Sequence, residues 1–278
     1  MKTLKSISQV RKCRRLLKGR VVFVPTMGAL HHGHAALIRM ARRIAGKDGM
    51  VLVSIFVNPT QFGPKEDFSA YPRPLRNDLK TCRDAGADAV FLPSITEMYP
   101  ADASVLINET SLSSVLCGRS RAGHFSGVCT IVSKLFHIVA PTHAIFGEKD
   151  WQQLAIIRRM VRDLDFDLEI IPSPTVREPD GLAASSRNAY LTEAERQLAP
   201  QIYAALQSAS QKPTPAKVVS EAVKLIIKIP GTRIDYIEAI DAQTLQPLRQ
   251  RRTEGRLAAA VFLGKARLID NIPLPAMP

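Results

Sequence analysis

The sequence predicts an α/β fold, in which a parallel sheet has helices on both faces and a smaller α+β domain follows. Strand-like apolar runs alternate with helix-like segments through the first 175 residues. This alternation is typical of parallel sheets whose connections are helices. The apolar runs are nearly continuous, as in 51–57, which is typical of a sheet covered on both faces.

The elements of the first part follow one another regularly along the chain. Strands are predicted over 21–24, 51–57, 89–92, 144–146 and 168–171. Helices are predicted over 34–45, 75–85, 125–139 and 151–164. Ligands of such sheets bind beyond the carboxyl ends of the strands. Because His34, Asn58 and Gly147 each come after a predicted strand, we expect them to converge at that edge.

Proline and glycine signals separate the two parts. Pro172 and Pro174 break the chain, and the turn sequence Pro179-Asp180-Gly181 follows. We therefore predict two domains, 1–175 and 176–278. The second is expected to contain helices over 192–209 and 215–228, followed by strands over 234–240, 257–262 and 267–269.

Composition excludes several classes of protein. A hydrophobic fraction of 46% supplies a sizeable core, and neither an apolar run of 18 residues nor a secretion signal is visible. Cys13, Cys82, Cys117 and Cys129 form no Cys-x-x-Cys pair and lie away from the histidine cluster, which argues against a zinc site. We expect reduced thiols, a cytoplasmic location and no membrane partner.

The net charge of +13 has three interpretations: nucleic-acid binding, attraction of small anionic substrates, or a basic surface without a partner. The lysines and arginines are spread along the chain. Aromatic residues make up 6% and do not alternate with them. A stacking platform for single strands is therefore poorly supported, and we expect no nucleic-acid partner.

The most informative motif is His31-His32-Gly33-His34, between the first strand and its helix. A helix N-terminus offers unpaired N–H groups and a partial positive charge to a phosphate, and imidazoles add hydrogen-bond donors. Gly33 allows close approach of the backbone. The alternative is a surface turn that happens to contain histidines.

Three further groups can serve an anionic substrate. Gly147-Glu148-Lys149-Asp150 places an ammonium and a carboxylate after a strand, and Ser185-Ser186-Arg187-Asn188 can clamp a phosphate. Gln61 and Gln153 suit a hydroxylated carboxylate. The alternative for the first group is a solvated charged turn, for the second a helix cap or loop, and for the two glutamines an ordinary surface position. Arg119–His124 can serve an anion or form a structural loop.

In order and spacing, these segments resemble the pantoate–β-alanine ligase family over essentially the whole chain. The quoted stretches are the following: 25–34, 54–62, 68–73, 123–128, 146–154, 180–188 and 264–270. Family members often have other residues where His32, Ala122 and Ala184 stand here. The resemblance implies a Rossmann-like first domain of the HIGH nucleotidyltransferase superfamily, a C-terminal lid and a homodimer.

The resemblance also implies the reaction and the site. Pantoate and ATP give pantoyl adenylate and pyrophosphate, β-alanine then gives pantothenate and AMP, and Mg²⁺ is required. The implied ATP-binding residues are Met27, Gly28, Ala29, Leu30, His31, His32, Gly33, His34, Gly147, Glu148, Lys149, Asp150, Val176, Ala184, Ser185, Ser186 and Arg187. The implied catalytic residues are His34 as proton donor, His31, Lys149, Ser185, Ser186 and Arg187, and Gln61 and Gln153 hold substrate.

Two rival functions differ from this expectation. Another adenylyl-transferring enzyme of the same superfamily would act on a nucleotide or a phosphopantetheine, against which the contexts of Gln61 and Gln153 argue. A nucleic-acid-binding protein would bind random DNA or RNA with a steep salt dependence.

Overall fold

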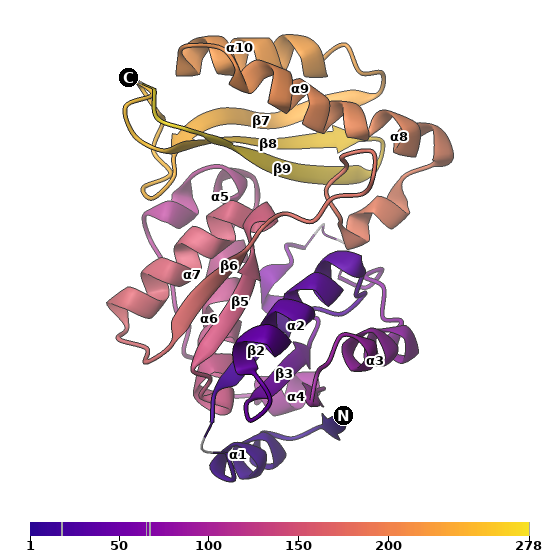
Figure 1. Ribbon diagram of the computed structural model, residues 1–278, viewed down its shortest axis with the longest axis vertical. Coiled ribbons are helices and arrows are strands. Elements are labelled where there is room, and N and C mark those ends of the chain that lie inside the picture. Colours follow the sequence, from indigo (N-terminus) through magenta and orange to yellow (C-terminus); the bar gives the residue numbers. More distant parts are fainter. Residues whose placement is uncertain (18, 65, 67, 278) are drawn as a thin grey trace. The chain divides into compact units, whose positions relative to one another are not determined.

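The computed structural model describes residues 1–17, 19–64, 66 and 68–277 (Figure 1). The chain divides into two compact units that are not continuous in sequence. The first unit comprises Met1–Ser113, Ser120–Glu148 and Gln153–Pro174. The second unit comprises Ser114–Arg119, Lys149–Gln152 and Thr175–Pro278, so that it includes two short segments from the earlier part of the sequence.

The first unit contains a six-stranded parallel sheet, which confirms the predicted fold class. Its strands are β1 (Lys2–Leu4), β2 (Val21–Thr26), β3 (Met50–Ile55), β4 (Ala89–Phe91), β5 (His143–Gly147) and β6 (Glu169–Ser173). Their order is β1-β4-β3-β2-β5-β6. From β2 the chain proceeds to one side through β3 and β4, and later to the other through β5 and β6. The switch point therefore lies between β2 and β5, where such sheets bind ligands.

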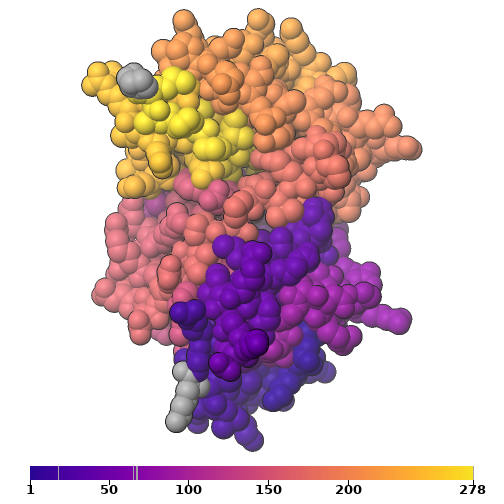
Figure 2. Space-filling view, in the orientation of Figure 1, coloured from indigo at the N-terminus to yellow at the C-terminus, as the bar shows by residue number. Residues whose placement is uncertain are grey.

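Helices cover both faces of this sheet. The main ones are α1 (Ile7–Arg15), α2 (His32–Ala45), α3 (Leu75–Asp84), α6 (His124–Val139) and α7 (Trp151–Asp163), with the short α4 (Ile95–Met98). The short α5 (Cys117–Ser120) belongs almost entirely to the second unit. Val22 and Val24 of β2 share a core with Ile38 of α2. Between them, Phe23 meets Phe136 of α6 edge-on, with ring centroids 6.4 Å apart. Because neighbouring strand residues point to opposite faces, α2 and α6 lie on opposite sides. On the side seen in Figure 2, N-terminal segments, drawn indigo to purple, form much of this unit's surface.

The structure adds elements and moves some predicted boundaries. Strand β1 and helix α1 were not predicted from the sequence, because β1 is very short and only Val10 of α1 is buried. Helix α2 begins at His32 because the His31 side chain caps it, and β3 ends at Ile55 rather than at residue 57. The expected loop after β3 contains a 3₁₀ turn, η1 (Pro59–Gln61).

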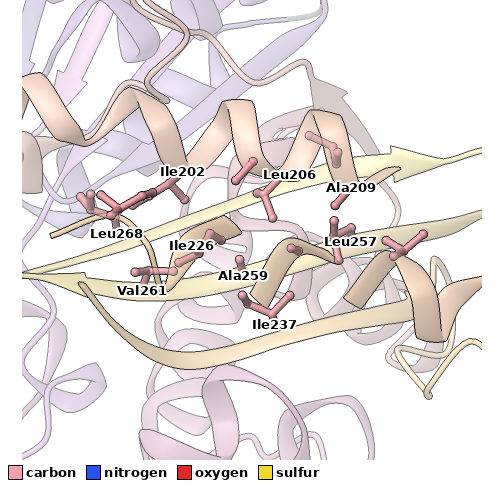
Figure 3. Close-up of a cluster of buried hydrophobic side chains, with 14 of the residues drawn as sticks. Ile202, Leu206, Ala209, Ile226, Ile237, Leu257, Ala259, Val261 and Leu268 are labelled. Carbon is pink, nitrogen blue, oxygen red and sulfur yellow. The ribbon is translucent and has the colours of Figure 1, made fainter. Parts of the chain in front are cut away.

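The second unit pairs helices with an antiparallel sheet. Strands β7 (Thr232–Asp241), β8 (Gly255–Leu263) and β9 (Ala266–Leu274) follow α8 (Glu193–Leu198), α9 (Pro200–Ser210) and α10 (Pro215–Ile226). Helices α9 and α10 pack on one face of the sheet (Figure 1). Leu206, Ile226 and Val261, all fully buried, join helix and strand side chains in one core (Figure 3).

One prediction in this unit is wrong. A single helix was expected over 192–209, whereas the structure has α8 and α9. Pro200 lacks an N–H group to continue the hydrogen-bond ladder, and it stands in the first turn of the new helix, where no such bond is needed.

Two further structural findings concern membranes and thiols. Within the described ranges, no helix combines the length and the apolar character that a membrane crossing requires. None of the four cysteines, Cys13, Cys82, Cys117 and Cys129, forms a disulfide in the described part of the chain. Burial raises the pKa of Cys82 to about 12 and that of Cys129 to about 11, which makes these two thiols unreactive.

Candidate active site

At the carboxyl end of β2 the chain makes a tight turn, Met27–Leu30. Gly28 and Ala29 have left-handed backbone angles, with φ of 85° and 51°. The Thr26 hydroxyl donates to Ser54 O over 2.7 Å and accepts from Gly28 N over 3.2 Å. A Cβ on Gly28 would lie 3.0 Å from both Ile55 and a carboxylate oxygen of α3, so that both space and backbone angle favour glycine.

That carboxylate belongs to Asp78 of α3, a residue that lies outside the motifs of the predicted site. Its two oxygens accept hydrogen bonds from the backbone N–H groups of Ala29, over 3.0 Å, and Leu30, over 2.7 Å. The residue is 1% exposed. Burial raises the pKa of Asp78, and the two backbone hydrogen bonds oppose this shift. Asp78 thus holds the turn in place from a distant helix.

We expect Asp78→Asn to destabilise the protein by about 1–3 kcal/mol, because the asparagine amide cannot accept both backbone N–H groups and one buried donor loses its partner. The thermal unfolding midpoint measures this loss. Asp84→Asn is the matched control on the same helix, since Asp84 pairs with Lys80 at the exposed surface. Equal midpoints for the two variants would contradict the role given to Asp78.

Helix α2 begins at the predicted histidine motif. His31 is its N-cap, and its Nδ1 accepts from Gly33 N over 3.2 Å, while His34 Nδ1 accepts from His31 N over 3.3 Å. The two imidazole centroids are 4.1 Å apart. Since both Nδ1 atoms accept, each neutral ring carries its proton on Nε2. The helix start therefore combines two imidazole N–H donors with the positive end of the helix dipole.

Gln61, at the end of η1, is 8% exposed and not an ordinary surface glutamine. Its Nε2 donates to the sulfur of Met27 over 3.0 Å, which joins two predicted site segments. Its Oε1 accepts from Asn58 Nδ2 over 3.1 Å. Asn58 in turn accepts from the Tyr99 hydroxyl over 2.7 Å, so that the Gln61 side chain is held from two sides.

The Arg119–His124 stretch divides between the two units. In the first unit, Arg121 forms an ion pair with Glu66, and His124 contacts both Arg121 and the backbone of Gln61. The structural interpretation of this loop is therefore the better one for these residues. In the second unit, Arg119 pairs with Glu238 of β7.

The segment after β5 also divides between the units. Gly147 and Glu148 end a stretch of the first unit, and Gln153, in the first turn of α7, returns to it. Lys149 and Asp150 belong to the second unit, where Asn271 Nδ2 donates to Lys149 O over 3.0 Å. The Lys149 ammonium lies 3.6 Å from the Asp150 carboxylate, with 18% of its side chain exposed.

The remaining predicted residues lie together in the second unit. Ala184 N donates to Val176 O over 2.9 Å across a short antiparallel contact. The Ser185 side chain accepts from Arg187 N over 3.3 Å and caps the 3₁₀ turn η4 (Ser186–Tyr190). The cap predicted as the alternative for this motif is therefore present. The turn and its cap therefore bring together the Arg187 guanidinium and the hydroxyl groups of Ser185 and Ser186.

A buried ion pair connects β9 to the short hairpin that the antiparallel contact between Arg177 and Ala183 forms. Arg177 makes two hydrogen bonds with Asp270, of 2.6 and 2.9 Å, and its guanidinium stacks 3.5 Å from the ring centroid of Tyr203. Asp270 is buried. Because both oxygens of one carboxylate meet a stacked, planar guanidinium, the position of the hairpin is well defined.

These features define a class of protein: a doubly wound α/β protein in which a histidine-capped helix N-terminus lies beside the switch point of the sheet. Among the residues that the structure describes, no group of three or more His, Cys, Asp or Glu side chains can hold a metal ion. Comparison with known proteins makes the class more specific.

The family model described as pantoate-beta-alanine ligase matches residues 1–273. A pantothenate synthetase of Akkermansia muciniphila is 50% identical over an alignment of 283 positions, which covers 99% of this chain and all of that protein. One from Moorella thermoacetica is 50% identical over an alignment of 282 positions, which covers 99% of each chain.

Solved structures agree with this match. Pantothenate synthetase from Thermus thermophilus superposes with a TM-score of 0.93 at 42% identity, covering 99% of this chain and all of that one. Pantoate-beta-alanine ligase from Francisella tularensis, solved in complex with beta-gamma ATP and beta-alanine, gives a TM-score of 0.81 at 36% identity, covering 98% and 97%. The chain belongs to the pantoate–β-alanine ligase family and is an enzyme of that type.

Proposed function

We propose that this enzyme joins (R)-pantoate to β-alanine in two steps at the expense of ATP. A carboxylate oxygen of pantoate attacks the α-phosphorus, and pyrophosphate leaves. The neutral amine of β-alanine then attacks the acyl carbon of pantoyl adenylate, and AMP leaves with pantothenate as the product. The observation that carries this proposal is the start of α2, where two imidazole donors and the helix N-terminus adjoin the sheet's switch point.

ATP is assigned to the segments that offer donors to phosphates. In the first unit these are Met27–His34 and Gly147–Glu148, where His31 and His34 donate through Nε2 and the backbone turn admits close approach. In the second unit they are Lys149–Asp150, Val176 and Ala184–Arg187. A carboxylate attacking a phosphate brings two anions together, so that neutralising charge and positioning lower the barrier most.

Gln61 and Gln153 are assigned to the organic substrate. The Gln61 amide is fixed by Asn58, and a fixed amide can read a hydroxylated carboxylate with one donor and one acceptor. Gln153 lies in the first turn of α7, directly after the Gly147–Asp150 segment. No covalent enzyme intermediate is needed, because the activated acyl group is carried by AMP.

We assign Mg²⁺ to the phosphates of ATP rather than to a protein cage. Mg²⁺ prefers oxygen ligands and usually keeps several waters, which suits the partly exposed Asp150 carboxylate beside Lys149. When bound, the ion would neutralise phosphate charge, and Asp150 would hold it through water.

We assign separate roles to the two domains. Residues 1–175 bind ATP and pantoate, and residues 176–278 form a lid that shields the adenylate from water. The Ser185–Arg187 turn of the second domain supports this role, since it offers hydroxyls and a guanidinium to an anion. We place the enzyme in the cytoplasm, where ATP is available and free thiols are kept reduced.

We also propose a homodimer, and the segment 103–110, which has no regular secondary structure, supports it. Val105 and Leu106 are 82% and 67% exposed in a single copy, and neighbouring apolar side chains this exposed are typical of contact surfaces. We expect Val105→Asp with Leu106→Asp to give monomers, as measured by sedimentation. Exposed Leu164, just after α7, is changed to Asp as the control expected to stay dimeric. A dimeric double variant would show that this segment is not the interface.

Exchange of labelled pyrophosphate into ATP tests the function. It is measured with magnesium, with and without pantoate, and in the absence of β-alanine. Pantoate-dependent exchange is expected, because the first step is reversible. Absence of exchange in folded protein that binds ATP would overturn pantoate as the substrate.

A further inference from the structure

We infer that Glu66, Arg121 and His124 form a positioning relay that fixes Gln61 for the organic substrate. The inference rests on the proposed substrate role of Gln61 and adds three residues to which that role assigns nothing. All four residues lie in the first unit, although they come from η1, the loop after it, the turn before α6 and the start of α6.

The relay is a continuous chain of hydrogen bonds. The Arg121 guanidinium donates to both carboxylate oxygens of Glu66, over 2.8 and 2.6 Å. Its Nη1 lies 2.9 Å from His124 Nε2, and His124 Nδ1 lies 2.8 Å from the backbone oxygen of Gln61. The chain thus leads from a carboxylate near the surface to the backbone of a buried glutamine.

The chemistry of the partners decides which atom donates and which accepts in each hydrogen bond of the relay. A guanidinium only donates, so that His124 Nε2 must accept from Arg121. The imidazole proton then lies on Nδ1, which donates to the carbonyl of Gln61. A protonated His124 would instead point an N–H at the guanidinium. Arg121 therefore selects the tautomer that holds Gln61.

Charge and burial support this arrangement. His124 is 9% exposed, and the side chains of Glu66 and Arg121 are 25% and 17% exposed. Burial opposes ionisation of Glu66, yet its contacts with Arg121 lower the pKa of this carboxyl overall. Glu66 thus keeps a negative charge that balances the guanidinium beside the imidazole and holds it in place.

The backbone around Gln61 is held closely enough for such positioning to matter. A Cβ on Gly127 of α6 would collide with the backbone oxygen of Thr60, so that α6 and η1 are in direct contact. Asn58 binds both Gly127 O and the Gln61 side chain, each over 3.1 Å. With its side chain held by Asn58 and its carbonyl by His124, Gln61 has a single orientation toward substrate.

The test measures pantoate dependence of pyrophosphate exchange in a series of variants. His124→Leu is expected to raise the apparent KM for pantoate about five- to tenfold, with a much smaller change in kcat and in the KM for ATP. His124→Asn is expected to restore most of the affinity, because its amide nitrogen occupies nearly the position of Nδ1. His137→Leu, an exposed histidine on the same helix, is the control and should match the wild type.

A double-mutant cycle separates positioning from general structural support. Gln61→Ala alone is expected to raise the KM for pantoate, and adding His124→Leu to it should have little further effect, because without the Gln61 amide His124 has no substrate-binding group left to position. Independent, multiplying effects would overturn the relay, as would a His124→Asn variant no better than His124→Leu. An unchanged KM in Gln61→Ala would instead overturn the proposed role of Gln61.

Glu66→Gln tests the relay independently, in the event that His124→Leu does not fold. This change lies at the outer end of the relay and keeps a hydrogen-bond acceptor for Arg121 while removing the charge. We expect a KM for pantoate raised about two- to fivefold with an unchanged thermal unfolding midpoint. A wild-type KM in this variant would contradict the inference.

Discussion

The Lys149→Ala variant is expected to lose at least about 100-fold in pantoate-dependent pyrophosphate exchange while it keeps its fold. The Lys149 side chain is mostly buried, and its ammonium is 3.6 Å from the Asp150 carboxylate. As the transition state gathers negative charge around the α-phosphorus, loss of a fixed positive charge raises the barrier more than it weakens binding of the ground state. The effect should therefore appear mainly in kcat.

Two further variants show which property of Lys149 matters. Lys149→Arg keeps the charge but replaces a compact ammonium with a planar fork, so that partial recovery is expected. Lys80→Ala removes an exposed lysine from α3 and should leave exchange unchanged. Exchange near the wild-type rate in Lys149→Ala would exclude the lysine from the phosphate site.

The His34→Ala variant is expected to lose about 10²–10³-fold in exchange rate, since it removes the Nε2 donor assigned to a phosphate. It also removes the acceptor for His31 N at the start of α2, which should cost about 0.5–2 kcal/mol of stability. Exchange kinetics and thermal unfolding, measured on the same preparations, report these two effects separately.

Amide substitutions at this position distinguish the donor from the cap. The amide of His34→Asn lies near Nδ1 and can keep the cap, whereas the amide of His34→Gln lies near Nε2 and can keep the donor. We expect His34→Asn to be stable but slow and His34→Gln to recover part of the rate. A His34→Asn variant that exchanges pyrophosphate at the wild-type rate would mean that His34 serves the helix and not the reaction.

The sequence was sufficient to predict the parallel sheet because the apolar runs that become β2, β3 and β5 are local patterns. The histidine motif was likewise visible because a strand, a turn and a helix start follow one another directly. Boundaries were less accurate. The break at Pro200 was missed because the apolar pattern continues through it, and β1 and α1 bury too few side chains to give a periodic signal.

Around Gln61, the structure shows contacts between residues that are far apart in the sequence, which no local pattern could indicate. Glu66 and Arg121 are separated by 55 residues, and neither belongs to a pattern that marks it as a partner of the other. His124, the first residue of α6, was a candidate anion ligand in the sequence, yet its Nδ1 faces the backbone carbonyl of Gln61. A side chain's direction depends on the packing of α6 against η1, which no local motif specifies.

By itself, the sequence determined the class of fold, the family and the segments most suited to an anionic substrate, because periodicity and motifs are properties of neighbouring residues. Only the tertiary structure decided how those segments are held. Asp78 is 48 and 49 residues from the two N–H groups that it binds, and its burial arises only when α3 packs beside the turn. Hydrogen bonds between distant, buried groups depend on the completed fold, and for that reason they were invisible in the order of the residues.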